Sequence, residues 1–181
     1  MIVTHGRTRG RVSRYGTDDY GRWSWIRLNA NTGDIVVISV YQMSDQLEYL
    51  QDGNKSTKTF CLQQHSMIQE DNRSGTPRHI FPEDLTNFLD QIKIDGDQIL
   101  LMGNFNELFQ PQSNIMDIND LSGIIDLPQA CIGHQNFSTH ARNRSNQRID
   151  YALGSPELLN SITKCGYQPI GKNYKGDHQR F

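Results

Sequence analysis

The sequence predicts one mixed α+β domain that spans residues 1–181. At 181 residues, the chain has the length of a single ordinary domain. Strand-length runs of β-branched residues are separated by segments with helical periodicity, in an order typical of a layered α/β or α+β domain. Hydrophobic residues make up 35% of the chain and charged residues 21%, which favours a soluble globular domain over a disordered or fibrous chain.

Two strands joined by a turn open the predicted order of elements. Residues 22–29 alternate, so two tryptophans share one face and two aliphatic residues share the other. Residues 29–34, with Gly33, have turn chemistry. Residues 34–41 (DIVVISVY) form a continuous β-branched run, which fits a central strand covered on both faces. We therefore expect these two strands to form a hairpin.

Helices and shorter strands are expected to follow the hairpin. A helix is expected over 58–72, and Pro82 is expected to open a clearer helix that ends near Asp95-Gly96. The second prediction rests on apolar residues at i, i+3, i+4 and i+7, namely Leu85, Phe88, Leu89 and Ile92. The remaining elements are a strand over 98–105, a helix over 119–127, a strand over 148–153, a helix over 156–163 and a strand over 164–170.

Composition also limits the cellular setting that we expect. The longest apolar runs are of strand length, well below the ~18 consecutive apolar residues that a membrane helix needs. The first 14 residues lack the apolar core of a signal peptide, and the three cysteines are odd in number and far apart. We therefore expect an intracellular monomer of the nucleus or cytoplasm, without a membrane partner, a disulfide framework or a zinc cluster.

Charge is unevenly distributed along the chain, although the formal net charge is only −2. Basic and acidic residues number ten and eight over 1–82, one and nine over 83–126, and seven and three over 127–181. This pattern fits a carboxylate-rich metal centre beside basic rims that face phosphates, and it fits equally an ordinary acidic helix face with solvated basic loops.

Polar side chains gather where the apolar strands end, a common place for catalytic groups. Taken singly, each has an ordinary structural explanation: a half-buried strand tyrosine, a turn asparagine, an aspartate paired with an arginine, or a solvated histidine. The residues concerned are Tyr41, Asn104, Asn106, Asp150, Asp177 and His178.

Taken together and in order, these clusters resemble the motifs of the endonuclease/exonuclease/phosphatase family, which includes exonuclease III, DNase I and the apurinic-site endonucleases. The resemblance implies a four-layer α/β/β/α sandwich of two mixed sheets, here incomplete at both ends. The sequence between the motifs is similar to the variants of this domain that are carried beside reverse transcriptases in retroelements. The motifs are Ser39-Val40-Tyr41, Gly103-Asn104-Phe105-Asn106, Arg148-Ile149-Asp150-Tyr151 and Gly176-Asp177-His178.

The resemblance implies phosphodiester hydrolysis dependent on Mg²⁺ or Mn²⁺, with nucleic acid, chiefly DNA, as partner and nicking in a retroelement context as the activity. It implies that His178 meets the scissile phosphate or handles its proton, that Asp150 orients the imidazole, and that Asp177 supports the metal or the attacking water. Tyr41 and Asn106 would contact the phosphate. Further phosphate contacts are expected from Arg142, Arg144 and Arg148.

The chain departs from the family pattern in ways that predict weak activity. Asn104 stands where the family has an aspartate that orients or deprotonates the water, and an amide cannot act as a base at neutral pH. Gly176 replaces the usual serine. No glutamate precedes the tryptophan-containing strand, where the family carries a metal-binding one. We therefore expect a truncated domain with little or no hydrolysis, and robust cleavage would imply that Glu70 or Glu107 holds the metal.

Two other functions remain open from the sequence. The scaffold could be an inactive remnant or a nucleic-acid-binding module, with basic side chains on backbone phosphates, namely Arg142, Arg144, Arg148, Lys172 and Lys175. It could also act on a small phosphoester, because the same motifs serve small substrates. The arginine-rich arm over 5–14 could follow phosphates, or it could be a basic chain end with no dedicated partner.

Overall fold

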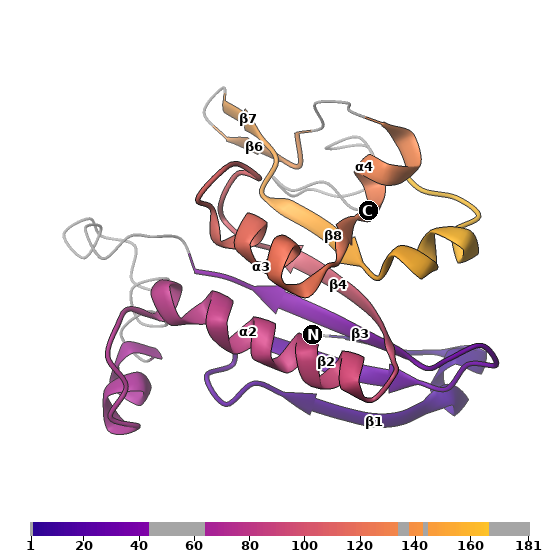
Figure 1. Cartoon of the computed structure of the whole chain (residues 1–181), viewed down its shortest axis with the longest axis horizontal. Helices are drawn as coiled ribbons and strands as arrows, with labels where there is room; N and C mark the ends of the chain where they lie inside the picture. The colour runs from indigo at the N-terminus through magenta and orange to yellow at the C-terminus, as the bar shows by residue number, and fades with distance from the viewer. Residues whose placement is uncertain (1, 44–63, 134–137, 143–144, 167–181) are drawn as a thin grey trace.

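A six-stranded mixed sheet is the centre of the computed structural model, which describes residues 2–43, 64–133, 138–142 and 145–166 (Figure 1). The strand order is β1-β2-β3-β4-β8-β5, and a separate two-stranded sheet pairs β6 with β7. The mixed α+β class is thereby confirmed. The strands are β1 (Val12–Thr17), β2 (Trp23–Leu28), β3 (Ile35–Tyr41), β4 (Gln98–Asn104), β5 (Ile125–Asp126), β6 (His140–Arg142), β7 (Ser145–Gln147) and β8 (Asp150–Gly154).

The predicted hairpin forms, because β2 and β3 pair antiparallel across their whole length. β4 then pairs parallel with β3, and β8 pairs antiparallel with β4. The chain crosses from β3 to β4 through α2 (Pro77–Ile94), as parallel neighbours require. One end of the sheet therefore carries the carboxyl ends of β3 and β4 beside the start of β8.

Apolar side chains bind α2 to one face of this sheet. Alternate residues of β3 are buried beneath it, and α2 contributes its own buried positions at i, i+4 spacing. Trp23 stacks on Phe88 with ring centroids 5.8 Å apart. In Figure 1 α2 and α3 (Asn114–Ser122) lie on the viewer's side of the sheet. This core includes Val36, Ile38, Val40, Phe81, Leu85, Leu89, Ile99 and Leu101.

A buried arginine fixes the start of β2 against α2. The Arg22 side chain is only 3% exposed, pairs with Asp18 at 2.7 Å and reaches Asp84 of α2 at 2.8 Å. Arg73 also binds Asp84, at 2.6 Å. Burial raises the pKa of the Asp84 carboxyl, but the hydrogen bonds from Arg73 and Arg22 outweigh it, so the pKa lies below its usual value.

The prediction that the central helix opens at Pro82 is wrong by one and a half turns. The helix begins at Pro77, after the N-cap Thr76, whose hydroxyl accepts the backbone N–H of His79 at 3.2 Å. Pro82 lies inside the helix and has no N–H for the Arg78 carbonyl four residues earlier. The side-chain amide of Asn114 donates to that carbonyl instead, at 3.2 Å.

The helix predicted over 119–127 is divided in the structure. α3 begins earlier, at Asn114, because Ser113 caps it, and ends at Gly123, whose positive φ of 62° terminates the helix. β5 and the short α4 (Leu127–Ile132) follow. The helix predicted over 156–163 is a 3₁₀ helix over Pro156–Ser161.

Three further predictions concern segments near the limits of the described residues. Residues 64–70 are helical, within the helix predicted over 58–72. Of the strand predicted over 164–170, residues 164–166 are not in a strand and the rest lies outside the described residues. The arginine-rich arm forms a 3₁₀ helix over Gly6–Arg11 and leads into β1, an edge strand. No helix among the described residues is long and apolar enough to cross a membrane.

Candidate active site

Three predicted site residues form a row across three neighbouring strands. Tyr41 at the end of β3 is in register with Asn104 at the end of β4. Asn104 is in turn in register with Asp150 at the start of β8. Residues in register on adjacent strands project from the same face of a sheet. The row therefore gathers a phenol, an amide and a carboxylate at one edge, on the face opposite the packed α2.

A glycine allows the two parallel strands to approach each other just below this row. A Cβ at Gly103 would overlap the carbonyl oxygen of Val40 on β3. Gly103 is in register with Val40 on β3 and with Tyr151 on β8. It therefore lies between these two residues, one position further into the sheet than the row of Tyr41, Asn104 and Asp150. Only a residue without a side chain fits there.

Asn106 is fixed beside the row by its own side chain and backbone. Its backbone N–H donates to the side-chain oxygen of Asn104 at 2.7 Å, and its side-chain amide donates to the Gln42 carbonyl at 2.7 Å. The N–H of Gln42 donates to the Asn104 carbonyl at 2.9 Å. Asn106 adopts a left-handed φ of 51°, which asparagine tolerates better than most residues. The turn after β4 is thus joined to the segment after β3.

Asp150 is anchored from the side opposite β4. The residue is 8% exposed, and its backbone N–H donates to the hydroxyl of Thr139 at 2.9 Å. The same hydroxyl accepts the N–H of Ile149 at 3.0 Å, and Thr139 is fully buried. Asp150 therefore begins β8 in a position that the hairpin of β6 and β7 helps to fix.

Arg148 is held by an acidic partner and an aromatic ring in the structure. Its guanidinium lies 2.7 Å from a carboxylate oxygen of Asp126 and 4.6 Å from the ring centroid of Tyr151. The Tyr151 hydroxyl accepts the N–H of Phe109 and donates to the Arg148 carbonyl, and burial raises its pKa to about 12. The predicted phosphate contact of Arg148 stays a prediction.

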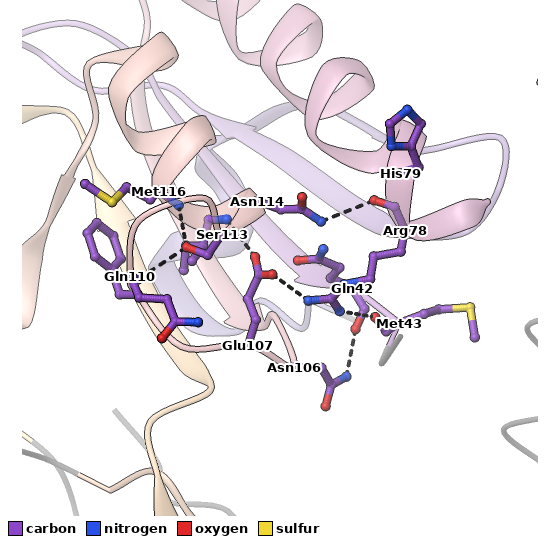
Figure 2. A network of polar contacts seen from close by, with 12 residues as sticks. Gln42, Met43, Arg78, His79, Asn106, Glu107, Gln110, Ser113, Asn114 and Met116 are labelled. Atoms are coloured by element: carbon purple, nitrogen blue, oxygen red, sulfur yellow. Dashed lines mark hydrogen bonds and ion pairs between the residues drawn. The ribbon is translucent and has the colours of Figure 1, made fainter. Parts of the chain in front are cut away.

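A buried ion pair that the sequence did not reveal lies directly behind Asn106 (Figure 2). A side-chain oxygen of Glu107 binds Arg78 at 2.5 Å, and its other oxygen accepts the N–H of Ile115 at 2.6 Å. Arg78 also donates to the carbonyl of Met43 at 2.7 Å. Burial raises the pKa of Glu107, opposed by the charge of Arg78 and by the Ile115 amide. Arg78 and Glu107 are 29 residues apart, and no local motif links them.

Several predicted site residues cannot be placed. Asp177, His178 and Arg144 lie outside the described residues, and of Arg142 only the backbone in β6 is described. The pairing of Asp150 with His178 therefore stays a prediction.

The described residues do not on their own fit a magnesium ion. Among them, no three His, Cys, Asp or Glu side chains gather in a way that could hold a metal. Asp150 is the sole carboxylate of the row, and both oxygens of Glu107 are engaged by protein donors. Glu70, the other substitute ligand considered, is exposed and accepts the Ser66 hydroxyl at 3.2 Å. Mg²⁺ prefers several carboxylate and water oxygens, so further ligands are needed.

Comparison with known proteins yields matches only among solved structures. No family model matches the sequence, and no curated protein matches it. A 3′ phosphatase from Neisseria bound to a product DNA hairpin is similar with a TM-score of 0.60 and 16% identity, over 92% of this chain and 67% of that one. A 3′-5′ exonuclease from Neisseria meningitidis gives the same values. An AP endonuclease from Archaeoglobus fulgidus gives a TM-score of 0.56 and 14% identity, with the same coverage.

The structural matches and the sequence motifs indicate the same fold. At such low identity they establish the fold, and they cover nearly all of this chain but about two thirds of each neighbour. The strand that ends in Tyr41, the strand that ends in Gly103-Asn104 and the strand that begins at Asp150 lie side by side within that fold. The chain therefore has the fold of the endonuclease/exonuclease/phosphatase family, as its motifs indicated.

Proposed function

We propose that this chain carries the phosphodiester-hydrolysing site of a nuclease domain, with DNA as substrate and nicking in a retroelement context as the activity. The observation that supports the proposal most is the row of Tyr41, Asn104 and Asp150 on three adjacent strands. A phenol and an amide at one sheet edge can donate hydrogen bonds to a phosphate, and a carboxylate beside them can orient a histidine.

Tyr41 and Asp150 of the row, and Asn106 beside it, each have a distinct proposed task. Tyr41 is 40% exposed, so its hydroxyl would donate to a phosphate oxygen from the solvent side of the sheet edge. Asn106 would present its side chain to the same phosphate. Asp150 would hold the imidazole of His178 in the orientation that proton transfer needs.

A divalent cation, Mg²⁺ or Mn²⁺, is part of the proposal. When bound, it would stabilise negative charge on the phosphate oxygens and the leaving group. Asp177 is the proposed ligand, and Asn104 is the described residue whose replacement by aspartate would add a second carboxylate beside Asp150. This requirement rests on the motif resemblance.

We further propose that the sheet belongs to a four-layer sandwich. Helix α2 covers one face, whereas the other face carries half-buried apolar side chains such as Ile26, Val37 and Leu100. A second sheet packed about 10 Å away would cover them. The row of polar residues would then lie at the rim between the two sheets.

Binding of nucleic acid without hydrolysis is the second candidate, and Asn104 favours it. The side-chain oxygen of Asn104 already accepts the Asn106 N–H, a bond that serves the turn equally well with or without catalysis. A neutral amide at this position retains the shape of the site and lacks the base. A module of this kind would bind DNA through its arginines and leave it intact.

The test compares binding with cleavage for the same protein. DNA binding is measured by fluorescence anisotropy, and nicking of supercoiled plasmid is followed with Mg²⁺ and with chelator. Both are run on the 181-residue chain and on a version joined to an upstream segment with the family's asparagine and glutamate strands. Hydrolysis predicts nicking by the longer version that stops with chelator and with Asp150→Asn. Binding that persists without any nicking in either version would favour the second candidate, and hydrolysis of p-nitrophenyl phosphate alone would favour a small phosphoester.

A further inference from the structure

The ion pair of Arg78 and Glu107 connects four segments that meet behind the candidate site (Figure 2). Arg78 comes from the first turn of α2, and Glu107 follows β4. Through the Ile115 N–H, Glu107 also binds the first turn of α3. Through the Met43 carbonyl, Arg78 holds the segment that leaves β3. Both side chains are largely buried, at 15% and 11% exposure.

The two segments that this pair joins are the ones that carry phosphate-binding candidates. Met43 lies two residues after Tyr41, and Glu107 directly follows Asn106. Beyond the last strand pair, the Asn106 amide reaches the Gln42 carbonyl, and the guanidinium of Arg78 reaches both Met43 and Glu107. The planar guanidinium offers two parallel donor groups, so one side chain can bind both segments at a fixed spacing.

We propose that Arg78 and Glu107 form a positioning pair, which sets the spacing between the segment after Tyr41 and the turn of Asn106. Neither residue touches the substrate in this proposal. The pair acts by holding the hydrogen bond between Asn106 and Gln42, and with it the direction in which the Asn106 side chain points. Its importance for hydrolysis rests on the proposed function, whereas its effect on local structure does not.

The competing explanation is that the pair stabilises the fold as any buried ion pair does. A matched control exists at the opposite end of the same sheet, where Arg27 of β2 binds Asp97, which directly precedes β4, at 2.8 Å. Asp97 is even more buried than Glu107, with 4% of its side chain exposed against 11%. Loss of either ion pair lowers global stability. Only loss of the Arg78–Glu107 pair is expected to loosen the site.

The experiment measures amide hydrogen exchange by NMR in the 181-residue chain. Glu107→Gln keeps an oxygen for the Ile115 N–H and removes the negative charge that faces Arg78, so some loss of global stability is expected with it. Its counterpart is Asp97→Asn. The reporters are the N–H groups of Gln42 and Asn106, which bond to Asn104, and the reference is the centre of the β2–β3 hairpin. Global stability is measured in denaturant for each variant.

Glu107→Gln is expected to accelerate exchange at the Gln42 and Asn106 amides by about 10-fold or more beyond the change at the reference amides. Asp97→Asn is expected to leave that difference unchanged. Arg78→Lys, which keeps the charge but not the two-pronged donor, is expected to loosen the Gln42 amide while the Ile115 amide stays protected.

Equal exchange profiles in Glu107→Gln and Asp97→Asn, after allowance for global stability, would overturn the proposal. If Glu107→Gln is too unstable to measure, Arg78→Lys decides the question through the exchange rates of the Gln42 and Ile115 amides. Because exchange is read without DNA, a failure of the longer version to cleave DNA refutes the proposed function and leaves the positioning pair intact. In a cleaving version, the proposal expects Glu107→Gln to reduce kcat more than Asp97→Asn does.

Discussion

Replacing Asn104 by aspartate places two carboxylates opposite each other on neighbouring strands. Asn104 and Asp150 are in register across β4 and β8, and Asp150 is 8% exposed. An aspartate side chain has the shape of asparagine and can accept the Asn106 N–H as before, so the turn after β4 is expected to survive. The added charge is therefore the main effect of Asn104→Asp.

The cost of that charge can be bounded. Opposed side chains of an antiparallel pair lie roughly 5 Å apart, where two like charges repel by about 3 kcal/mol at an effective dielectric constant of 20. Exposed cross-strand pairs contribute about 0.2–1 kcal/mol. We expect Asn104→Asp to lower the free energy of unfolding by about 1–2 kcal/mol between these limits, which lowers Tm by roughly 2–8 °C for a domain of this size.

The repulsion predicts a definite pH dependence. It raises the carboxyl pKa values in the folded state, so the folded protein binds more protons than the unfolded chain and stability falls as pH rises through the carboxyl range. Below that range one carboxyl is protonated and the cost disappears. Millimolar Mg²⁺ is expected to restore stability at neutral pH, because a cation held between the two carboxylates removes the repulsion.

The assay is thermal unfolding of both proteins at pH 4 and pH 7, with and without Mg²⁺. Asn31→Asp, the same chemical change in the exposed turn between β2 and β3, serves as the control. If Asn104→Asp and Asn31→Asp shift Tm equally, or if the loss is independent of pH, the two side chains do not face each other as the register indicates.

Three further outcomes follow from the core and the site. Gly103→Ala is expected to prevent native folding, seen as loss of a cooperative melt, because its Cβ overlaps the Val40 carbonyl. Tyr151→Phe is expected to cost about 1–3 kcal/mol in denaturant unfolding, because the Phe109 N–H loses its acceptor. Burial raises the pKa of Asp84, but hydrogen bonds from two arginines lower it overall. Stability should therefore fall as pH drops below the usual carboxyl range, and Asp84→Asn should flatten that fall in acid titrations.

Local patterns in the sequence predict the hairpin at the centre of the sheet, but not the edge strand β1 or the order β3-β4-β8. The alternation over 22–29 and the β-branched run over 34–41 give the hairpin of β2 and β3. The position of Tyr41 and Asn104 at the ends of two strands predicts their proximity, because parallel neighbours end at the same edge. Side-chain period places each residue at a strand end, whereas the pairing of β3 with β4 and of β4 with β8 that forms the row comes from distant contacts.

The features that sequence patterns missed depend on partners distant along the chain. Pro82 is tolerated inside α2 because Asn114 donates to the Arg78 carbonyl in place of the proline, a contact across 36 positions that no helical pattern contains. The sequence suggested Glu107 only as a substitute metal ligand, and its burial against Arg78 exists only once α2 and α3 pack together. Such tertiary contacts override local signals for helix starts and for exposed charges.

The most direct test of the proposed site is the rate of plasmid nicking by Asn104→Asp in the version with the upstream segment. Restoring a carboxylate beside Asp150 is expected to raise the Mg²⁺-dependent rate by about 10²–10⁴-fold over the parent, and the gain should vanish on Asp150→Asn and on His178→Ala. If Asn104→Asp cleaves no faster than the parent, or if it keeps its rate with Asp150→Asn and His178→Ala, the hydrolysis does not occur at the row of Tyr41, Asn104 and Asp150.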